Sequence, residues 1–521
     1  MSQMLKSSGT LASATLTSRI LGMVREIVYA QFMGDTPVAS AFKLAFQIPN
    51  LFRRLLGEGA LSAAFIPIFK AKEKSENEQE MWRAANAVIS GMVVAAAGIV
   101  ALVILGISLA LAARQFEANT RLMLSLLRIM FPYMLVICLT AVLVGMLNAR
   151  GHFFIPAAGA VVLNLVMIAS VLFLAPRLGR ELDQQIFGLA IGVLIAGVAQ
   201  AAFQWPTLRR EGFRYQWVAP WRDPTVREVV RKMIPGALGV AAFQVNVLLT
   251  NGLAFWVDRQ IVASFDYAVR LMELPQGVFG ISLATYLLPT LSGLAAEKKY
   301  AEFRGTLQQG LSYLIFVNLI ASVLLVVLAE PIIRLIFEHG KFDEKSSQRA
   351  SFALACLAPG LVAFSTVNVV ARAFYALGDT ETPMKISVVC LGLNLVFALW
   401  LILPFRQGGL GIANTLTAYC NVGLLIYALS RKLKRLEMAW LVRVLPALLG
   451  SAIVAGAIAW GTGHVLERSL GREGLPARLG AVFVPMASAA LVYWGITFYL
   501  QVPAAKEIAS LFRQRLRVGS K

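Results

Sequence analysis

The sequence predicts an all-α membrane protein with about fourteen transmembrane helices, arranged as two six-helix lobes followed by two further helices. Three observations predict this fold. Of the 521 residues, 58% are hydrophobic and only 15% are charged, whereas about a quarter of the residues in a soluble domain are charged. Apolar runs as long as a bilayer crossing recur along the chain. Two groups of residues also repeat at nearly the same offset.

The apolar runs give the order of the predicted spans. A hydrocarbon core about 30 Å thick requires about 20 mostly apolar residues in a helix. Six spans fall in the first half of the chain, six in the second, and two more follow. In order they are 8–33, 37–69, 85–112, 123–148, 156–176, 185–206, 234–257, 262–292, 308–329, 350–376, 384–404, 409–430, 441–463 and 478–501.

Lysine and arginine are concentrated in alternate loops. Cytoplasmic loops carry such an excess, so we expect both termini to face the cytoplasm. The basic clusters on that side lie at 70–83, 209–232, 298–304, 431–435 and 513–517. The stretches 222–232 and 504–517 alternate charged and apolar residues at helical spacing, which predicts that they lie along the cytoplasmic interface.

The net charge of +20 does not favour a nucleic-acid partner. A nucleic-acid binder gathers its cations on a solvated face, whereas here they separate apolar runs. The four cysteines lie within apolar segments without a C-x-x-C pair, and the three histidines are scattered, so no disulfide framework, metal site or cofactor is expected. The N-terminal segment lacks an uninterrupted apolar stretch, which predicts a retained first helix rather than a cleaved signal.

An internal repeat relates the two halves. The segment around Pro49 resembles the segment around Pro275, and the two prolines are 226 residues apart. A second match, at an offset of 227, pairs Ala149, Gly151 and Pro156 with Ala376, Gly378 and Pro383. Because six helices are an even number, both copies keep one orientation, which predicts two lobes with a cleft between them. Chance similarity between membrane helices rich in proline and glycine is the alternative.

The repeat also predicts the domains. They are an N-terminal lobe at 1–206, a cytoplasmic linker with an amphipathic helix at 207–233, a C-terminal lobe at 234–430, the last two spans at 431–503 and a basic cytoplasmic tail at 504–521. The last two spans, rich in small and aliphatic residues, are interpreted either as an apolar groove for a lipid tail or as a packing element.

Charged residues inside three predicted spans are the strongest functional signal. A charged side chain at the bilayer centre costs about 2.5 to 3.5 kcal/mol on insertion scales, and such residues usually face a cavity or a partner. The first span has Arg19, Arg25 and Glu26, the second has Lys43, Arg53, Arg54 and Glu58, and the eighth has Asp266, Arg270 and Glu273. Cations outnumber acids in this set, which favours an anionic substrate. Guanidinium groups match phosphate oxygens.

A structural role is the alternative for each arginine taken singly. Long basic side chains reach the interface or brace neighbouring helices, which applies most to Arg54. Arg128 and Arg372 lie alone in their spans and are interpreted as structural.

Pro49 and Pro275 interrupt the second and eighth spans where charge is highest. Broken helices mark the binding sites of transporters, so both prolines are predicted hinges of an alternating-access cleft. The polar residues of the seventh span either line the same cavity or form hydrogen bonds between helices. These residues are Gln244, Asn246, Thr250 and Asn251.

Five segments together resemble the MurJ (MviN) family. In order they are SRILGMVREIVYAQFMG at 18–34, FQIPNLFRRLLGEGALSAAFIPIF at 46–69, RLMELPQGVFGISLATYLLPTLS at 270–292, HGKF at 339–342 and ARAFYALGDTETP at 371–383. The second is the most specific. With the span layout, the resemblance covers almost the whole chain.

The resemblance implies a non-enzymatic flippase of the multidrug/oligosaccharidyl-lipid/polysaccharide exporter superfamily. Such a protein moves lipid II, the undecaprenyl-pyrophosphate-linked peptidoglycan precursor, from the cytoplasmic to the periplasmic leaflet of the bacterial inner membrane. The resemblance places the family's cavity arginines at Arg19, Arg25, Arg53 and Arg270 and its acids at Glu58 and Glu273. Membrane lipids are further expected partners, and the need for a coupling ion stays open.

The chain departs from the family at three positions. Members carry aspartates where this chain has Ser40 and Val269, and an apolar residue where it has Lys43. Ser40 and Lys43 therefore belong to the predicted substrate site, but any acid-based coupling at the changed positions is in doubt. Asp35 or Asp266 is the candidate replacement.

Three rival functions make different demands on the sequence. A multidrug or other exporter of the same superfamily predicts acids in the cavity and cationic substrates. A membrane enzyme acting on a lipid phosphate requires a nucleophile or a metal cluster, and no such constellation appears. An assembly scaffold without transport leaves the intramembrane charges unexplained.

Overall fold

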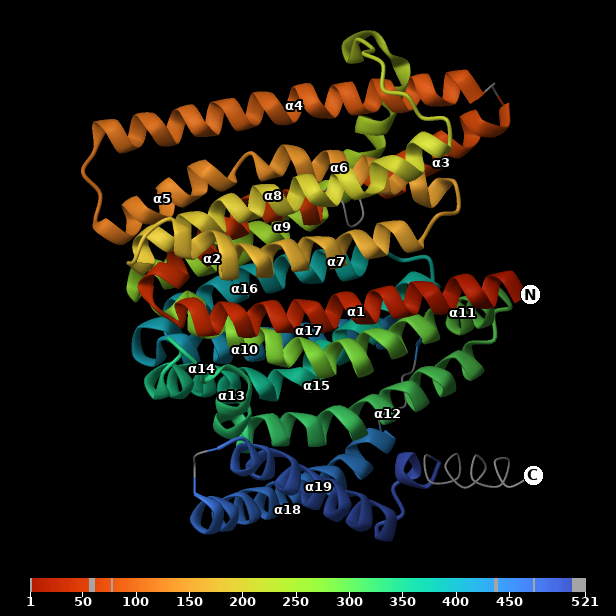
Figure 1. Cartoon of the computed structure of the whole chain (residues 1–521). Coiled ribbons are helices and arrows are strands. Elements are labelled where there is room, and N and C mark those ends of the chain that lie inside the picture. Colours follow the sequence, from red (N-terminus) through yellow and green to blue (C-terminus); the bar gives the residue numbers. More distant parts are fainter. Residues whose placement is uncertain (1, 56–60, 76–77, 435–438, 472–473, 508–521) are drawn as a thin grey trace. The chain divides into compact units, whose positions relative to one another are not determined.

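The computed structural model describes residues 2–55, 61–75, 78–434, 439–471 and 474–507, and within these ranges every regular element is a helix. This confirms the all-α prediction. The chain divides into two compact units, Met1–Ala263 and Ser264–Lys521, and Figure 1 labels their helices.

The helices of the first unit follow one another with short connections. They are α1 (Ser2–Met33), α2 (Pro37–Phe52), α3 (Leu61–Ser75), α4 (Glu78–Ala113), α5 (Ala118–Met130), α6 (Tyr133–Ala149), α7 (Phe154–Ala169), α8 (Leu182–Arg210) and α9 (Pro224–Val257). Short turns follow α7 at Ser170–Leu174 and Ala175–Arg177, and another precedes α9 at Pro220–Arg222.

The second unit begins within α10. Its helices are α10 (Ile261–Pro275), α11 (Ser282–Ala296), α12 (Tyr300–Val327), α13 (Ala329–Phe337), α14 (Glu344–Leu357), α15 (Leu361–Ala376), α16 (Glu381–Phe405), α17 (Gln407–Lys432), α18 (Ala439–Leu470) and α19 (Leu475–Tyr499). Short turns fill Gln276–Ile281 and Ala358–Gly360.

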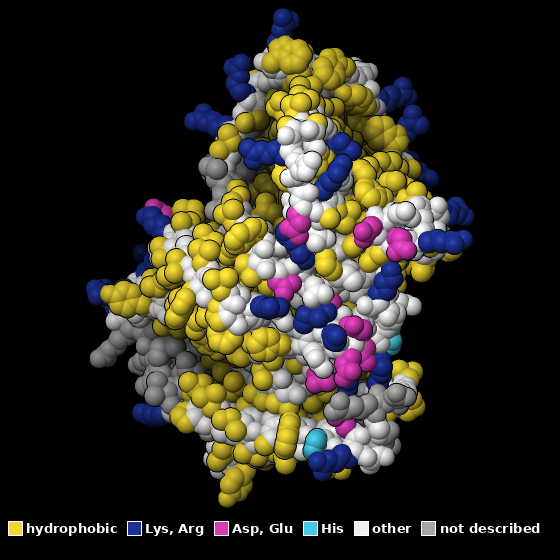
Figure 2. All heavy atoms as spheres, turned by 90° about the vertical axis from the view of Figure 1, so that its left-hand side faces the viewer, with side chains coloured by type: hydrophobic (Ala, Val, Ile, Leu, Met, Phe, Trp, Pro, Cys, Tyr) yellow, Lys and Arg dark blue, Asp and Glu magenta, His cyan; other side chains and the backbone are white. Residues whose placement is uncertain are grey.

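Eleven stretches among the described residues are long and apolar enough to cross a membrane. They coincide with the predicted spans except the first, second and seventh, which correspond to α1, to α2 with α3, and to α9. The count of fourteen therefore stays a prediction. Hydrophobic side chains cover large continuous areas of the face shown in Figure 2, a surface that suits lipid better than water.

Helix α9 differs from the sequence prediction. It runs without a break from Pro224 to Val257, so the predicted interfacial stretch 222–232 and the seventh span largely form one helix. Asp223 begins it, because its carboxylate accepts the N–H of Thr225 at 2.8 Å, and a proline at the first helical position has no N–H to lose. The boundary between the two units falls after α9, whereas the six-helix lobes and the linker at 207–233 stay predictions.

The second repeated motif forms the same turn in both units. Helix α6 ends at Ala149 and α15 at Ala376. Two residues later come Gly151 with φ +86° and Gly378 with φ +74°, a left-handed conformation in which a Cβ is strained. The closing hydrogen bonds also correspond: Gly151 N to Asn148 O and His152 N to Leu147 O in one turn, Gly378 N to Tyr375 O and Asp379 N to Phe374 O in the other.

Both predicted proline breaks change the helix geometry. Pro49 lies in the last turn of α2, and residues 53–55 continue as a wider π-helical turn. Pro275 ends α10, and a π-helical turn spans Gln276–Ile281 before α11. A proline removes one backbone hydrogen bond and clashes with the preceding turn, and single π-turns frequently mark functional positions in helices.

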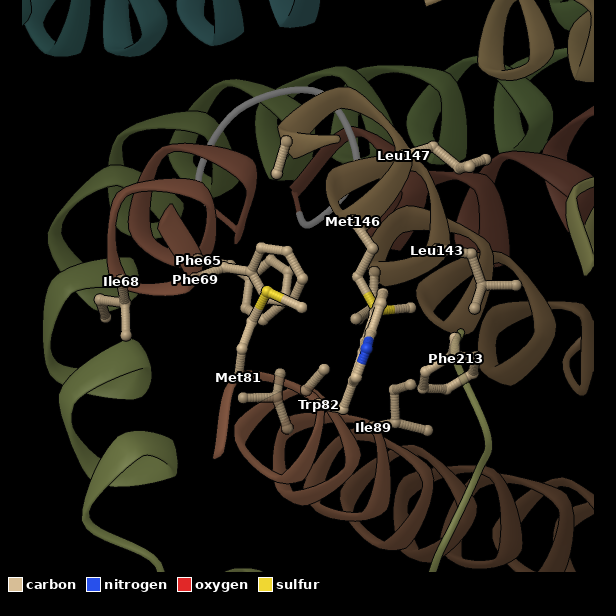
Figure 3. Close-up of a cluster of buried hydrophobic side chains, with 14 of the residues drawn as sticks. Phe65, Ile68, Phe69, Met81, Trp82, Ile89, Leu143, Met146, Leu147 and Phe213 are labelled. Carbon is tan, nitrogen blue, oxygen red and sulfur yellow. The ribbon is translucent and has the colours of Figure 1, made fainter. Parts of the chain in front are cut away.

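One buried hydrophobic cluster packs several helices of the first unit together (Figure 3). It joins α3, α4, α6, α8, the segment after α8 and α9, and its larger members include Phe65, Ile68, Phe69, Met81, Trp82, Ile89, Leu143, Met146, Leu147, Leu208 and Phe213. Aromatic rings pack edge to face within it, as Phe69 does on Trp82 at 5.7 Å between centroids.

Candidate functional site

The predicted site residues of the first unit centre on a buried carboxylate in α1. Arg25 Nη2 lies 2.7 Å from Glu26 Oε1, with 15% and 5% of the two side chains exposed. A charge this deeply buried requires a partner, because removing it from water costs several kcal/mol. The guanidinium also lies over the ring of Tyr29, 5.6 Å from its centroid, which adds a cation–π contact.

Lys43 binds the same carboxylate from α2. Its Nζ lies 3.8 Å from Glu26 Oε2, and only 9% of the lysine side chain is exposed. The carboxylate is thus shared by cations from α1 and α2. Thr36 begins α2 by accepting the N–H of Ala39, and this cap starts the helix that carries Lys43.

Two further predicted residues of α2 and its extension have local contacts. Arg53 Nε donates to Asn50 Oδ1 at 2.8 Å, one helical turn back and beside Pro49. Ser40 is fully buried, and its Oγ accepts the N–H of Ala263 at 3.0 Å. Ser40 therefore joins α2 to the first turn of α10 by a neutral hydrogen bond.

Arg270 and Glu273 form an ion pair within α10 of the second unit. Arg270 Nη1 lies 3.1 Å from Glu273 Oε2 at i,i+3 spacing, so Arg270 reaches an acid one turn further along its own helix. About a third of the arginine and half of the glutamate are exposed, so water screens this pair more than the pair in α1.

The remaining predicted residues have different surroundings. The side chain of Arg19 is exposed, and Glu58 lies outside the described residues. In the seventh span, Asn251 Nδ2 donates to Gln47 Oε1 of α2 at 2.8 Å, which supports the hydrogen-bond alternative at this position. Arg372 lies over the ring of Tyr375, 5.9 Å from its centroid.

Sequence reasoning missed Asn164 as a partner of the arginine in α1. Asn164 Oδ1 accepts Arg25 Nη1 at 3.0 Å, and its Nδ2 donates to the carbonyl of Ser18 at 3.2 Å. The amide thus fixes α7 against two turns of α1. A buried asparagine within the apolar fifth span was the available signal, because buried polar groups are hydrogen-bonded.

The repeated turn in the first unit carries an ionic cluster outside the predicted spans. Arg150 lies 2.6 Å from Glu73, 3.5 Å from Glu78 and 2.8 Å from Glu211. His152 Nε2 also lies 2.8 Å from Glu211. Hydrogen bonds with His152 and Arg150 hold the pKa of Glu211 below its usual range, so the cluster ties four helix ends together near neutral pH.

The corresponding turn in the second unit has a smaller pair. Lys432 Nζ, at the end of α17, lies 2.6 Å from Asp379 Oδ2. Burial raises the pKa of the Asp379 carboxyl, but hydrogen bonds from Lys432 and Thr382 outweigh burial and lower the pKa to about 2.

This depressed pKa predicts a pH-dependent contribution to stability. A carboxyl whose pKa is lower in the folded state stabilises the fold above its unfolded pKa and loses that effect as the pH falls through the folded pKa. We expect Lys432→Met to lower the unfolding temperature near neutral pH. The difference from wild type should shrink as the pH falls from about 4 towards about 2.

Unfolding midpoints measured in detergent across this pH range test the prediction. Lys385→Met is the matched control, because its pair with Glu381 is largely exposed and should contribute little at any pH. A Lys432→Met difference that stays constant down to the lowest pH would show that Asp379 is not its cause.

Comparison with known proteins gives one consistent result. A family model described as "Lipid II flippase MurJ" matches residues 29–477. A probable lipid II flippase of Haemophilus influenzae is 32% identical over 474 residues, covering 86% of this chain and 90% of that protein. A probable lipid II flippase of Bdellovibrio bacteriovorus is 32% identical over 509 residues, covering 96% and 95%.

Solved structures show the same fold. A structure titled as the lipid II flippase MurJ in an inward closed conformation matches with a TM-score of 0.77 and 22% identity, covering 94% of this chain and 98% of that one. An inward-facing multidrug transporter of the MATE family matches with a TM-score of 0.62 and 16% identity, covering 82% and 98%. At these sequence identities the structural matches establish only the fold.

Proposed function

The chain belongs to the MurJ family of lipid II flippases, and from this premise we propose that it moves lipid II from the cytoplasmic to the periplasmic leaflet of the bacterial inner membrane. The chain is then a transporter without a catalytic step. We further propose that both termini face the cytoplasm, as the loop charges predict.

The single observation that carries this proposal is the cluster of Arg25, Lys43 and Glu26 inside the first unit. Cations held within an apolar helix bundle suit an anionic ligand, because a planar guanidinium donates two parallel hydrogen bonds to phosphate oxygens. Both cations already share one carboxylate. A pyrophosphate that enters the site therefore replaces the Glu26 carboxylate as the partner of Arg25 and Lys43. The two cations have an anionic partner both before and after the substrate binds.

The proposed substrate residues come from both halves of the chain. They are Arg19, Arg25, Ser40, Lys43, Arg53 and Glu58 in the first half, and Arg270 and Glu273 in the second. In this proposal the arginines and Lys43 hold the pyrophosphate, and the glutamates orient them. Pro49 and Pro275 act as hinges, each beside a π-turn.

Net export requires a driving force beyond the substrate itself. A ligand shifts a conformational equilibrium only by its difference in affinity for the two states. We therefore propose that an ion gradient, the membrane potential or removal of the product drives transport. A multidrug exporter is the second candidate, since the MATE structure shares the fold, but the cation-rich first two spans favour an anionic substrate.

Binding measurements with purified full-length protein in lipid nanodiscs test the proposal. We expect lipid II and undecaprenyl pyrophosphate to bind at least about tenfold more tightly than undecaprenol, because each charge-assisted hydrogen bond contributes about 1.5 to 3 kcal/mol. Equal affinity for undecaprenol would contradict a phosphate site. Tighter binding of a lipophilic cation would favour the multidrug alternative.

A further inference from the structure

The segment between α8 and α9 is fixed along one end of α4 (Figure 1). Phe213 enters the buried cluster and packs on Trp82 of α4 at 5.5 Å between ring centroids, as Figure 3 shows. Asn86 Nδ2 donates to the carbonyl of Arg214 at 3.0 Å. A Cβ on Gly91 of α4 would lie 3.2 Å from Pro220, so the C-terminal end of the segment also lies against α4.

Ser90 fastens the middle of this segment. Its buried Oγ accepts the N–H of Val218 at 3.4 Å and lies 3.2 Å from the hydroxyl of Tyr215. The backbone of the segment is therefore held from start to end by a helix. The direction in which its side chains point is set by that packing.

Two tryptophans project from the fixed segment. Trp217 is 57% exposed and Trp221 is 62% exposed, and their rings lie 6.5 Å apart between centroids in an edge-to-face arrangement. Tyr215 beside them is also exposed. Indole rings have an apolar body and a polar N–H, which places them preferentially at the level of lipid headgroups.

Exposed arginines flank the tryptophans in the sequence, within the segment and at the adjoining ends of α8 and α9. They are Arg209, Arg210, Arg214, Arg222, Arg227 and Arg231, and within the described part of the chain none of them forms an ion pair. The nearby acids are engaged elsewhere: Glu211 with Arg150, Asp223 with the first turn of α9 and Glu228 with Lys232. The segment therefore presents net positive charge beside its aromatic rings.

The length of α4 places the segment at the membrane boundary. Its 36 residues extend about 54 Å at about 1.5 Å each, whereas the hydrocarbon core is about 30 Å thick. One or both ends of α4 must therefore project beyond the core. The contacts to the segment lie at 82–91, where the predicted span 85–112 begins. Further along the same span, Leu102, Leu105 and Leu109 are exposed, as expected for side chains that face lipid.

We infer that residues 213–222 form an anchor that binds the anionic headgroup layer of the membrane, with Trp217 and Trp221 at the level of the lipid carbonyls and the arginines on the phosphates. The anchor is part of the first unit and is independent of the transported substrate. Basic residues near a membrane surface each contribute to binding anionic lipids, and the contacts with α4 remove the cost of ordering a flexible loop.

Fluorescence quenching by brominated lipids tests the depth of the two tryptophans. The full-length protein and the variant Trp217→Phe/Trp221→Phe are placed in bilayers with bromine near either end of the acyl chains. The difference in emission between the wild type and the variant is the signal of Trp217 and Trp221, two of the nine tryptophans. We expect bromine near the headgroups to quench it most. Quenching by aqueous iodide without any bromine effect, or strongest quenching by deep bromine, would overturn the inference.

Unfolding midpoints in nanodiscs test the charge of the partner. Replacing zwitterionic by anionic lipid should raise the midpoint of the wild type. Arg214→Ala/Arg222→Ala should lose about a third of that rise, because basic residues near the surface contribute roughly equally and these are two of the six exposed arginines. Arg177→Ala/Arg180→Ala, at exposed arginines of the α7–α8 connection, is the matched control. An equal rise in all three proteins would exclude an anionic-lipid anchor.

Discussion

Replacing Arg25 by alanine is expected to lower lipid II translocation by at least about tenfold, because a hydrogen bond to a charged group contributes about 1.5 to 3 kcal/mol. The Arg25 side chain is only 15% exposed and contacts Glu26 and Asn164, so its guanidinium is held in place before any ligand arrives. Pre-organised donors lose less entropy on binding. Arg25→Lys keeps the charge but not the planar fork, and we expect an intermediate rate.

Translocation is measured in cells or proteoliposomes with variants matched for abundance in the membrane. Arg128→Ala is the control, because that arginine lies in another predicted span and its side chain is exposed. We expect the control to transport normally. Normal transport by Arg25→Ala at wild-type abundance would remove this residue from the substrate site.

Replacing Glu26 by glutamine is expected to cause the largest loss of stability. The change leaves Arg25 and Lys43 without the carboxylate that they share in a nearly buried position, and breaking a buried pair from one side costs about 3 to 5 kcal/mol. We expect a clear fall in the unfolding midpoint in detergent. The double variant Glu26→Gln/Lys43→Met should recover part of it, because one of the two cations is also removed.

Glu80→Gln is the matched control for this cycle. Its pair with Arg83 is mostly exposed, and such pairs contribute about 1 kcal/mol at most. If Glu26→Gln destabilised the protein no more than this control, the buried carboxylate would not be what holds α1 and α2 together. If adding Lys43→Met to Glu26→Gln did not raise the unfolding midpoint, the loss of stability in Glu26→Gln would arise from Arg25 alone.

The sequence predicted the helical spans well because span length is a local property. A bilayer of fixed thickness requires long apolar helices. Such helices can be recognised in the sequence without knowing which of them pack together. The sequence repeat that pairs Gly151 with Gly378 also corresponds to a structural repeat, since each glycine adopts the same left-handed conformation just after a helix. The amphipathic pattern at 222–232, however, gave no sign that α9 continues through it.

The sequence by itself determined that this chain is helical, crosses the membrane repeatedly and retains cations within its apolar segments. Only the tertiary structure decided the partners of those cations. Nothing in the sequence pairs Lys43 with Glu26, places Asn164 on Arg25 or lays residues 213–222 along α4. Helix formation follows from neighbours a few residues apart, whereas these contacts depend on which helix faces pack together, and many packings share one apolar pattern.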